Sequence, residues 1–242
     1  MSPSDIEVVG PRGGYPHTHT VILLHDKGSD CIEFSVKFFK SEASESVDEP
    51  RTLADIFPTI RWVFPSALIL HSSRLNCPES QWFDIWSMER PNERPELQTN
   101  GLQNSIERLL NFIEEEELRV PPQSIFIGGI SQGFATAYSA YLFSARGYGG
   151  LIDISGWAPL EALAMLGGEL DDEEGDEPTP VFVAHCRDDP IVPVNEGRAL
   201  SSMLWLRPET IVDFHEYGSG GHWINEPTGV DDLVDFLRNN MD

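Results

Sequence analysis

The sequence is poor in basic residues and has no long apolar run. Sixteen Lys and Arg stand against 40 Asp and Glu, which gives a formal net charge of −24. Phosphate backbones and anionic lipid surfaces repel such a polyanion, so we expect no nucleic-acid partner. No apolar run approaches the length of a membrane span, which predicts that the chain does not insert stably into a membrane.

The sequence has too few cysteines for a disulfide framework. The three cysteines, Cys31, Cys77 and Cys186, are far apart, and none belongs to a C-x-x-C pair. This pattern argues against a disulfide scaffold and a zinc site, and it favours a reducing compartment. The first ten residues, MSPSDIEVVG, lack the apolar core of a secretion signal, so we expect a cytoplasmic location.

Apolar runs alternate with amphipathic stretches along all 242 residues. This alternation predicts a single α/β domain over residues 1–242, with a mostly parallel sheet flanked by helices. Strands are predicted over Val21–His25, Ile60–Phe64, Ser124–Gly128, Leu151–Ile154, Val181–His185 and Val212–Tyr217, and helices over Asn100–Leu118 and Val230–Leu237. Two acidic stretches rich in helix and strand breakers, Ser41–Pro50 and Gly167–Pro180, are expected to be exposed loops.

The strongest catalytic signal is the string GISQG at residues 129–133. It follows the predicted strand Ser124–Gly128 and opens the helix-like run FATAYSAYLF. A G-x-S-x-G between strand and helix is typical of a nucleophile elbow, whose glycines let the chain turn sharply beneath an exposed serine. We therefore predict that Ser131 is a nucleophile, with an ordinary strand-to-helix turn as the alternative.

A serine hydroxyl needs a base, and the base needs an acid to orient it. In α/β-hydrolases the chain order is serine, acid, histidine, and this sequence supplies that order. RDDPIVP follows the strand predicted to end at His185, and a glycine-rich loop ending at His222 follows the last predicted strand. His222 is thus the predicted base. Asp188 and Asp189 compete for the acid role, and because neighbours in an extended chain point to opposite sides, only one can face the histidine.

Other histidines have simpler explanations. His25 and His185 end predicted strands and are expected to be structural. His17 and His19 form an H-T-H string, for which a metal pair is conceivable and an exposed surface loop is the expectation.

The order of these motifs resembles the acyl-protein thioesterase and phospholipase/carboxylesterase family of α/β-hydrolases. The resemblance runs from about Val21 to Leu237 and is carried by VILLHDKGSD, PTIRWVFPSA, QWFDIW, FIGGISQGFATA, ISGWAPL, HCRDDPIVP and YGSGGH. It implies an α/β-hydrolase fold and hydrolysis of a carboxylic ester or thioester, with no cofactor and no metal. The D-x-x-V-P aspartate of the family matches Asp189, not Asp188.

The resemblance also implies binding residues. The oxyanion hole of the family uses two backbone N–H groups, which match Lys27 and Gln132. Trp82 and Trp157 match its acyl-binding walls, with core packing as an equal alternative. Phe134 stands where the family usually has a small glycine and is expected to narrow the site. The implied substrate is a small-molecule ester or an S-acylated protein.

One departure bears on catalysis. Family members usually read H-G-x-G-D, whereas this chain reads HDKGSD, with Asp26 in place of a glycine next to Lys27. A carboxylate there would oppose a developing oxyanion unless it points away or pairs with Lys27. Because the rest of the site is complete, we predict that Asp26 points away. A non-catalytic ligand-binding homologue, and a lyase or isomerase that reuses the triad, are the alternatives to a hydrolase.

Overall fold

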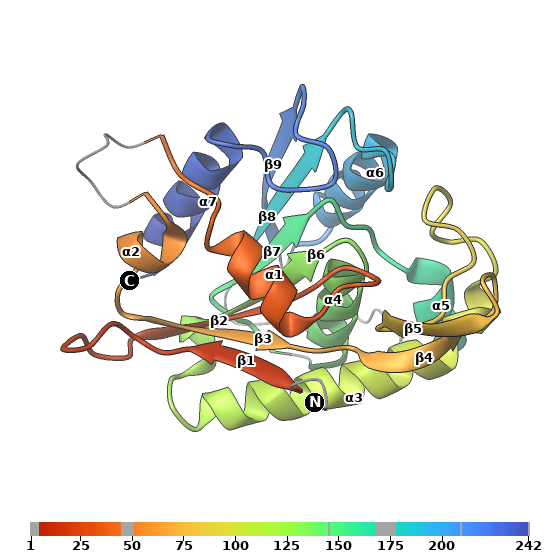
Figure 1. Ribbon diagram of the computed structural model, residues 1–242, viewed down its shortest axis with the longest axis horizontal. Helices are drawn as coiled ribbons and strands as arrows, with labels where there is room; N and C mark the ends of the chain where they lie inside the picture. The colour runs from red at the N-terminus through yellow and green to blue at the C-terminus, as the bar shows by residue number, and fades with distance from the viewer. Residues whose placement is uncertain (1–4, 45–50, 145, 168–177, 209, 242) are drawn as a thin grey trace.

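Seven strands form the central sheet of the computed structural model, which describes residues 5–44, 51–144, 146–167, 178–208 and 210–241 (Figure 1). In chain order they are β1 (Ile6–Val9), β2 (His19–Leu24), β3 (Ile60–Pro65), β6 (Ile125–Ile130), β7 (Gly150–Ile154), β8 (Thr179–Cys186) and β9 (Thr210–Tyr217). Their order in the sheet is β1-β3-β2-β6-β7-β8-β9. Only β1 runs antiparallel to its neighbour, so the predicted mostly parallel sheet is confirmed.

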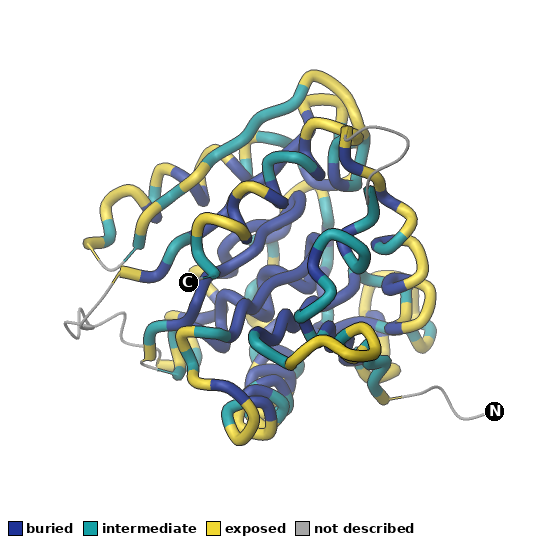
Figure 2. The backbone as a smooth tube through the Cα atoms, turned by 90° about the vertical axis from the view of Figure 1, so that its left-hand side faces the viewer, coloured by how far each residue is buried: buried dark blue, intermediate teal, exposed yellow. Residues whose placement is uncertain are grey.

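Helices cover both faces of this sheet. The first group is α1 (Cys31–Phe38), α2 (Leu53–Ile56) and α7 (Thr228–Asn239); the second is α3 (Thr99–Glu117), α4 (Gln132–Ser144), α5 (Leu160–Met165) and α6 (Val194–Leu204). Strand side chains alternate between two apolar cores: Val21 and Leu23 pack with the first group, and Ile22 and Leu24 with the second. Figure 2 shows the strands as the buried centre of the molecule.

Beside the main sheet lies a small antiparallel hairpin, β4 (Leu68–Ser72) and β5 (Cys77–Gln81). Two short 3₁₀ helices, η1 (Pro95–Leu97) and η2 (Pro122–Ser124), complete the described elements. The hairpin contacts the loop after β2, because the Gly28 N–H donates to the Ser80 carbonyl over 2.8 Å. This hairpin was not predicted from the sequence, although it borders the site described below.

Each predicted strand and helix is present, with ends that differ by at most two residues. The predicted loop Gly167–Pro180 is wrong at its end, because Thr179 and Pro180 already belong to β8; residues 168–177 lie outside the described residues. Of the predicted loop Ser41–Pro50, residues 45–50 lie outside them too, and Glu42 forms a bridge with Thr52.

The surface loop expected at the H-T-H string is wrong for its second histidine. His19 is the first residue of β2 and is buried. Its Nδ1 lies 3.0 Å from the Thr18 hydroxyl, and His17 Nε2 lies 3.0 Å from the Thr20 hydroxyl, so each ring has a local partner. Across the described ranges, no three His, Cys, Asp or Glu residues are grouped to hold a metal ion, and no helix is both long and apolar enough to cross a membrane.

Candidate active site

The parallel sheet brings the predicted site residues to one edge. Lys27 follows β2, Ser131 follows β6, Asp189 follows β8 and His222 follows β9. These four strands are parallel, so their carboxyl ends meet at the same edge. Sites in open α/β sheets assemble at this edge.

Ser131 occupies a sharp turn between β6 and α4. Its φ is +58°, in the left-handed region, and the residue is fully buried. The glycines on either side permit the turn: a Cβ on Gly129 would lie 2.4 Å from the Leu24 carbonyl oxygen, and a Cβ on Gly133 would lie 2.3 Å from it. Only glycine allows β6 and α4 to approach β2 so closely. This is the geometry of a nucleophile elbow.

Asp189 and His222 are in direct contact. His222 Nδ1 lies 2.7 Å from Asp189 Oδ2, while Asp189 Oδ1 accepts the N–H groups of Ile191 at 2.8 Å and Val192 at 3.0 Å. Burial raises the pKa of the Asp189 carboxyl, but hydrogen bonds from His185 and His222 outweigh burial and hold that pKa well below its usual range. Asp189 is therefore a carboxylate, the form that can fix the tautomer of His222.

Asp188 does not point away from the histidine loop, contrary to the argument from an extended chain. It accepts the N–H groups of Gly220 at 3.3 Å and Gly221 at 2.9 Å. The reason is that the Asp189 N–H donates to the Cys186 carbonyl, so the chain turns here instead of extending. Both aspartates thus hold the loop that carries His222, one through its backbone and one through its imidazole.

Two further side-chain atoms of the predicted triad lack a hydrogen-bond partner among the described residues. Ser131 Oγ and His222 Nε2 are both buried, and neither makes a hydrogen bond within the described part of the chain. The structure thus joins acid and base, while transfer of a proton from serine to histidine stays a prediction.

The oxyanion hole is expected at two backbone N–H groups, those of Lys27 and Gln132. Within the described ranges, neither the Lys27 N–H nor the Gln132 N–H donates a hydrogen bond. Gln132 is the first residue of α4, so its N–H also lies at the positive end of a helix dipole. Binding of a developing oxyanion by these two groups stays a prediction.

The side chains around this loop hold it in place. His25 Nδ1 lies 2.7 Å from the Asp26 carbonyl and its Nε2 accepts the Ala67 N–H at 2.9 Å, which fixes a neutral imidazole. Trp82 Nε1 donates to the His25 carbonyl over 2.8 Å, and the Trp82 N–H donates to the Gln132 side chain over 2.9 Å. These contacts confirm a structural role for His25.

Lys27 does not pair with Asp26. Its ammonium lies 2.7 Å from Glu79 of β5, and this hydrogen bond lowers the pKa of Glu79. Asp26 instead belongs to the lining of a pocket of about 190 Å³, together with Glu33, Lys37 and Trp223. Ser131, Gln132 and His222 do not line that pocket. This placement supports the prediction that Asp26 points away from the reacting carbonyl.

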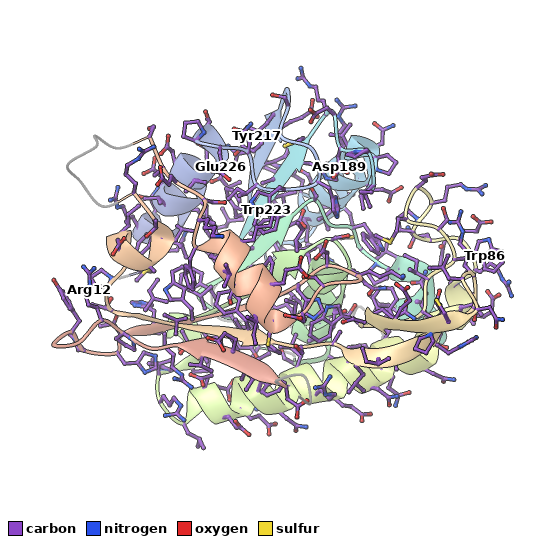
Figure 3. The ribbon with its side chains drawn as sticks, in the orientation of Figure 1. Arg12, Trp86, Asp189, Tyr217, Trp223 and Glu226 are labelled. Carbon is purple, nitrogen blue, oxygen red and sulfur yellow. The ribbon has the colours of Figure 1, made fainter. Side chains whose placement is uncertain are left out.

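A second pocket, of about 160 Å³, is also lined by Lys27. Its apolar lining consists of Leu75, Ile85, Trp86 and Met88. Figure 3 shows Trp86 at the margin of the molecule beside the hairpin, and Asp189 and Trp223 nearer the middle. This lining was not predicted from the sequence, although Ile85 and Trp86 belong to the family motif QWFDIW.

The three predicted substrate-binding residues lie in the core. Trp82 is 1% exposed, and Trp157 and Phe134 are fully buried. Phe134 stacks on Tyr138 with ring centroids 6.1 Å apart, and Trp157 meets Phe83 edge to face. Neither pocket beside Lys27 is lined by these residues. Their packing roles are clear, and contact with substrate stays a prediction.

Comparison with known proteins agrees with this geometry. Acyl-protein thioesterase 1 of Candida albicans is 26% identical over 99% of this chain and 98% of its own length. The Schizosaccharomyces pombe protein of the same name is 30% identical over 73% of this chain and 71% of its own. The crystal structure of Zea mays acyl-protein thioesterase 2 shares the fold, with a TM-score of 0.74 at 22% identity, over 98% of this chain and 99% of that one.

The sequence pattern of one family extends over almost the whole chain. The phospholipase/carboxylesterase pattern matches residues 5–241, which include every strand and helix of the described structure. The chain therefore belongs to the phospholipase/carboxylesterase family of α/β-hydrolases and is a hydrolytic enzyme of that family.

Proposed function

We propose that the protein hydrolyses a carboxylic ester or thioester through an acyl-serine intermediate, with Ser131 as nucleophile, His222 as base and Asp189 as the orienting acid. The 2.7 Å contact between His222 Nδ1 and Asp189 Oδ2 carries this proposal, and the turn that holds Ser131 at positive φ supports it. His222 removes the Ser131 proton as the oxygen attacks the carbonyl carbon. The N–H groups of Lys27 and Gln132 bind the oxyanion.

Collapse of the tetrahedral intermediate expels the alcohol or thiol, which takes the proton from His222. Water then attacks the acyl-serine with His222 again as base, and the carboxylic acid and free Ser131 are regenerated. Asp189 stays ionised throughout and stabilises the imidazolium. Each step uses groups of this chain, and the proposal includes no cofactor or metal.

The second pocket lined by Lys27 suggests where the acyl chain of the substrate binds. With its carbonyl at Lys27 N–H, the acyl chain extends into the apolar pocket of Leu75, Ile85, Trp86 and Met88. The relatives named acyl-protein thioesterase make an S-acylated protein a candidate substrate, and a small-molecule ester fits the same chemistry. A cytoplasmic location is part of this proposal.

A serine-directed fluorophosphonate tests the proposal directly. We expect stoichiometric labelling of the native protein on Ser131, because the reagent requires a serine activated by its base. Ser131→Ala should remain unlabelled. A panel of acyl chains of increasing length, as esters and as thioesters, then defines the substrate. Absence of labelling in the folded native protein would refute the proposed function.

Replacement of Asp26 tests the oxyanion hole. If Asp26 points into its own pocket, Asp26→Gly and the isosteric Asp26→Asn should each change ester turnover by less than about tenfold, well under the loss of one oxyanion donor. A rise of a hundredfold or more in both variants would show that the carboxylate blocks the hole. That result would favour a binder or a different reaction for the native protein.

A further inference from the structure

The Lys27 N–H belongs to a peptide group whose carbonyl is bound by a side chain. His25 Nδ1 lies 2.7 Å from the Asp26 carbonyl oxygen, which is part of the same peptide as the Lys27 N–H. A carbonyl oxygen only accepts, so His25 Nδ1 is the donor. The N–H of a trans peptide points opposite to its carbonyl oxygen, so this hydrogen bond constrains the direction of the Lys27 N–H. It also polarises the peptide, which makes that N–H a stronger donor.

The His25 imidazole is itself held at its other nitrogen. Nε2 accepts the Ala67 N–H at 2.9 Å, so Nε2 carries no hydrogen and Nδ1 carries one. The residue is fully buried, and its ring packs on that of Trp82 with ring centroids 5.2 Å apart. The ring therefore has one tautomer and one orientation, the one that donates to the Asp26 carbonyl.

Trp82 holds the peptide on the other side of Asp26. Its indole Nε1 donates to the His25 carbonyl oxygen over 2.8 Å. The two peptides that flank Asp26 are thus bound through their carbonyls, one by Trp82 and one by His25. Together the two side chains clamp the backbone at the position where this chain has an aspartate instead of the glycine usual in the family.

Trp82 is also tied to the second predicted oxyanion donor. The Trp82 N–H donates to Gln132 Oε1 over 2.9 Å, and the Ser105 hydroxyl of α3 donates to the Trp82 carbonyl over 2.5 Å. The side chains of His25, Trp82 and Gln132 are all buried, so water does not compete for these bonds. Hydrogen bonds therefore connect the residue of one donor, Gln132, with the peptide of the other, Lys27, through two buried side chains.

Resting on the proposed function, we propose that His25 and Trp82 are positioning residues that aim the Lys27 N–H at the oxyanion. His25 sets the direction of this N–H, and Trp82 sets its place relative to Gln132. Neither side chain needs to touch the substrate, so for Trp82 this role differs from the acyl-binding wall that the family resemblance implies. A donor held in this way binds the oxyanion without rearrangement, which is the condition for effective stabilisation of the transition state.

Removal of one indole N–H tests the clamp. Trp82→Phe keeps an aromatic ring but cannot donate to the His25 carbonyl, so kcat should fall by about ten- to a hundredfold, less than the loss of a whole oxyanion donor. KM should not change, because the weakened interaction is made only in the transition state. Trp62→Phe is the matched control and should keep the native kcat. Trp62 is 1% exposed, as Trp82 is, and its Nε1 has no hydrogen-bond partner in the described ranges.

Two replacements of His25 separate the roles of its two nitrogens. Asparagine places an amide N–H near the position of Nδ1, whereas glutamine places its amide near the position of Nε2. His25→Gln should therefore lower kcat by about a hundredfold, near the loss of one oxyanion donor, and His25→Asn should recover at least tenfold of that loss. A merely structural role would not favour asparagine in kcat when the two variants unfold at the same temperature.

The measurements are kcat and KM on one ester, with circular dichroism to show that each variant is folded. Equal kcat in Trp82→Phe and Trp62→Phe would overturn the proposal, and so would a His25→Asn variant no more active than His25→Gln. Fluorophosphonate labelling of the native protein separates these outcomes from failure of the proposed function. A labelled native enzyme with either of them overturns the positioning roles alone, whereas an unlabelled native protein overturns the proposed function and these roles together.

Discussion

Ser131→Ala is expected to abolish ester hydrolysis, with a loss in turnover on the order of a million-fold. The hydroxyl is the atom that bonds to the substrate, and Ser131 Oγ makes no hydrogen bond in the described structure that would give it a structural role. The fold should survive, because alanine fits the same buried space and the positive φ already exists with serine. Steady-state turnover of the best ester and the unfolding temperature are the two measurements.

The chain offers a closely matched control in Ser155. It directly follows β7, as Ser131 follows β6, is fully buried, has φ of +53° and has a hydroxyl without a partner in the described ranges. Ser155→Ala should keep turnover within about tenfold of the native value, as expected for a change outside the reacting groups. More than a few per cent of native activity in Ser131→Ala would contradict the assignment of the nucleophile.

Asp189→Asn is expected to reduce turnover by roughly ten-thousand-fold. Asparagine keeps the shape but presents no full negative charge to His222 Nδ1, so the imidazole loses both its fixed tautomer and the partner of its charged form. The hydrogen bonds from Ile191 and Val192 can still reach an amide oxygen, which should preserve the turn. The comparison is of kcat on one ester at pH 7 for folded proteins.

Asp188→Asn is the natural counterpart, because Asp188 meets the same loop through the Gly220 and Gly221 N–H groups. An asparagine oxygen can still accept from these donors, so we expect a far smaller loss than in Asp189→Asn. Equal or reversed losses would transfer the acid role to Asp188.

The fold was predictable where the periodicity was strong. Buried strands such as Val21–His25 read as continuous apolar runs, and the long helix α3 has a clear helical period. Elements without these patterns were missed: β1 is a four-residue, half-buried edge strand, and the hairpin of β4 and β5 carries polar and exposed residues. Packing against β3 and against the loop at Gly28 holds these segments, and such contacts are invisible in local sequence.

The candidate site, like the fold, was predictable only in part. The order of Ser131, Asp189 and His222 can be read directly from the sequence. The structure shows the contact between Asp189 and His222. The direction of the Asp188 side chain relative to the His222 loop depends on a turn. This turn could not be predicted from the assumption of an extended chain. The contact between His185 and Asp189 depends on this same turn after β8, and the lining of the apolar pocket required the placement of the hairpin.

The double attachment of the His222 loop has a consequence for local opening. Because Asp188 binds the backbone of the loop and Asp189 binds its histidine, the loop cannot detach from the turn after β8 without breaking both contacts. When this edge of the sheet unfolds locally, Asp189 and His222 are therefore expected to separate from the rest of the site, and to rejoin it, as one cooperative unit. Amide protons at Gly221 and around Asp189 should then exchange with solvent at matching rates, so that partly assembled forms of the site are rare.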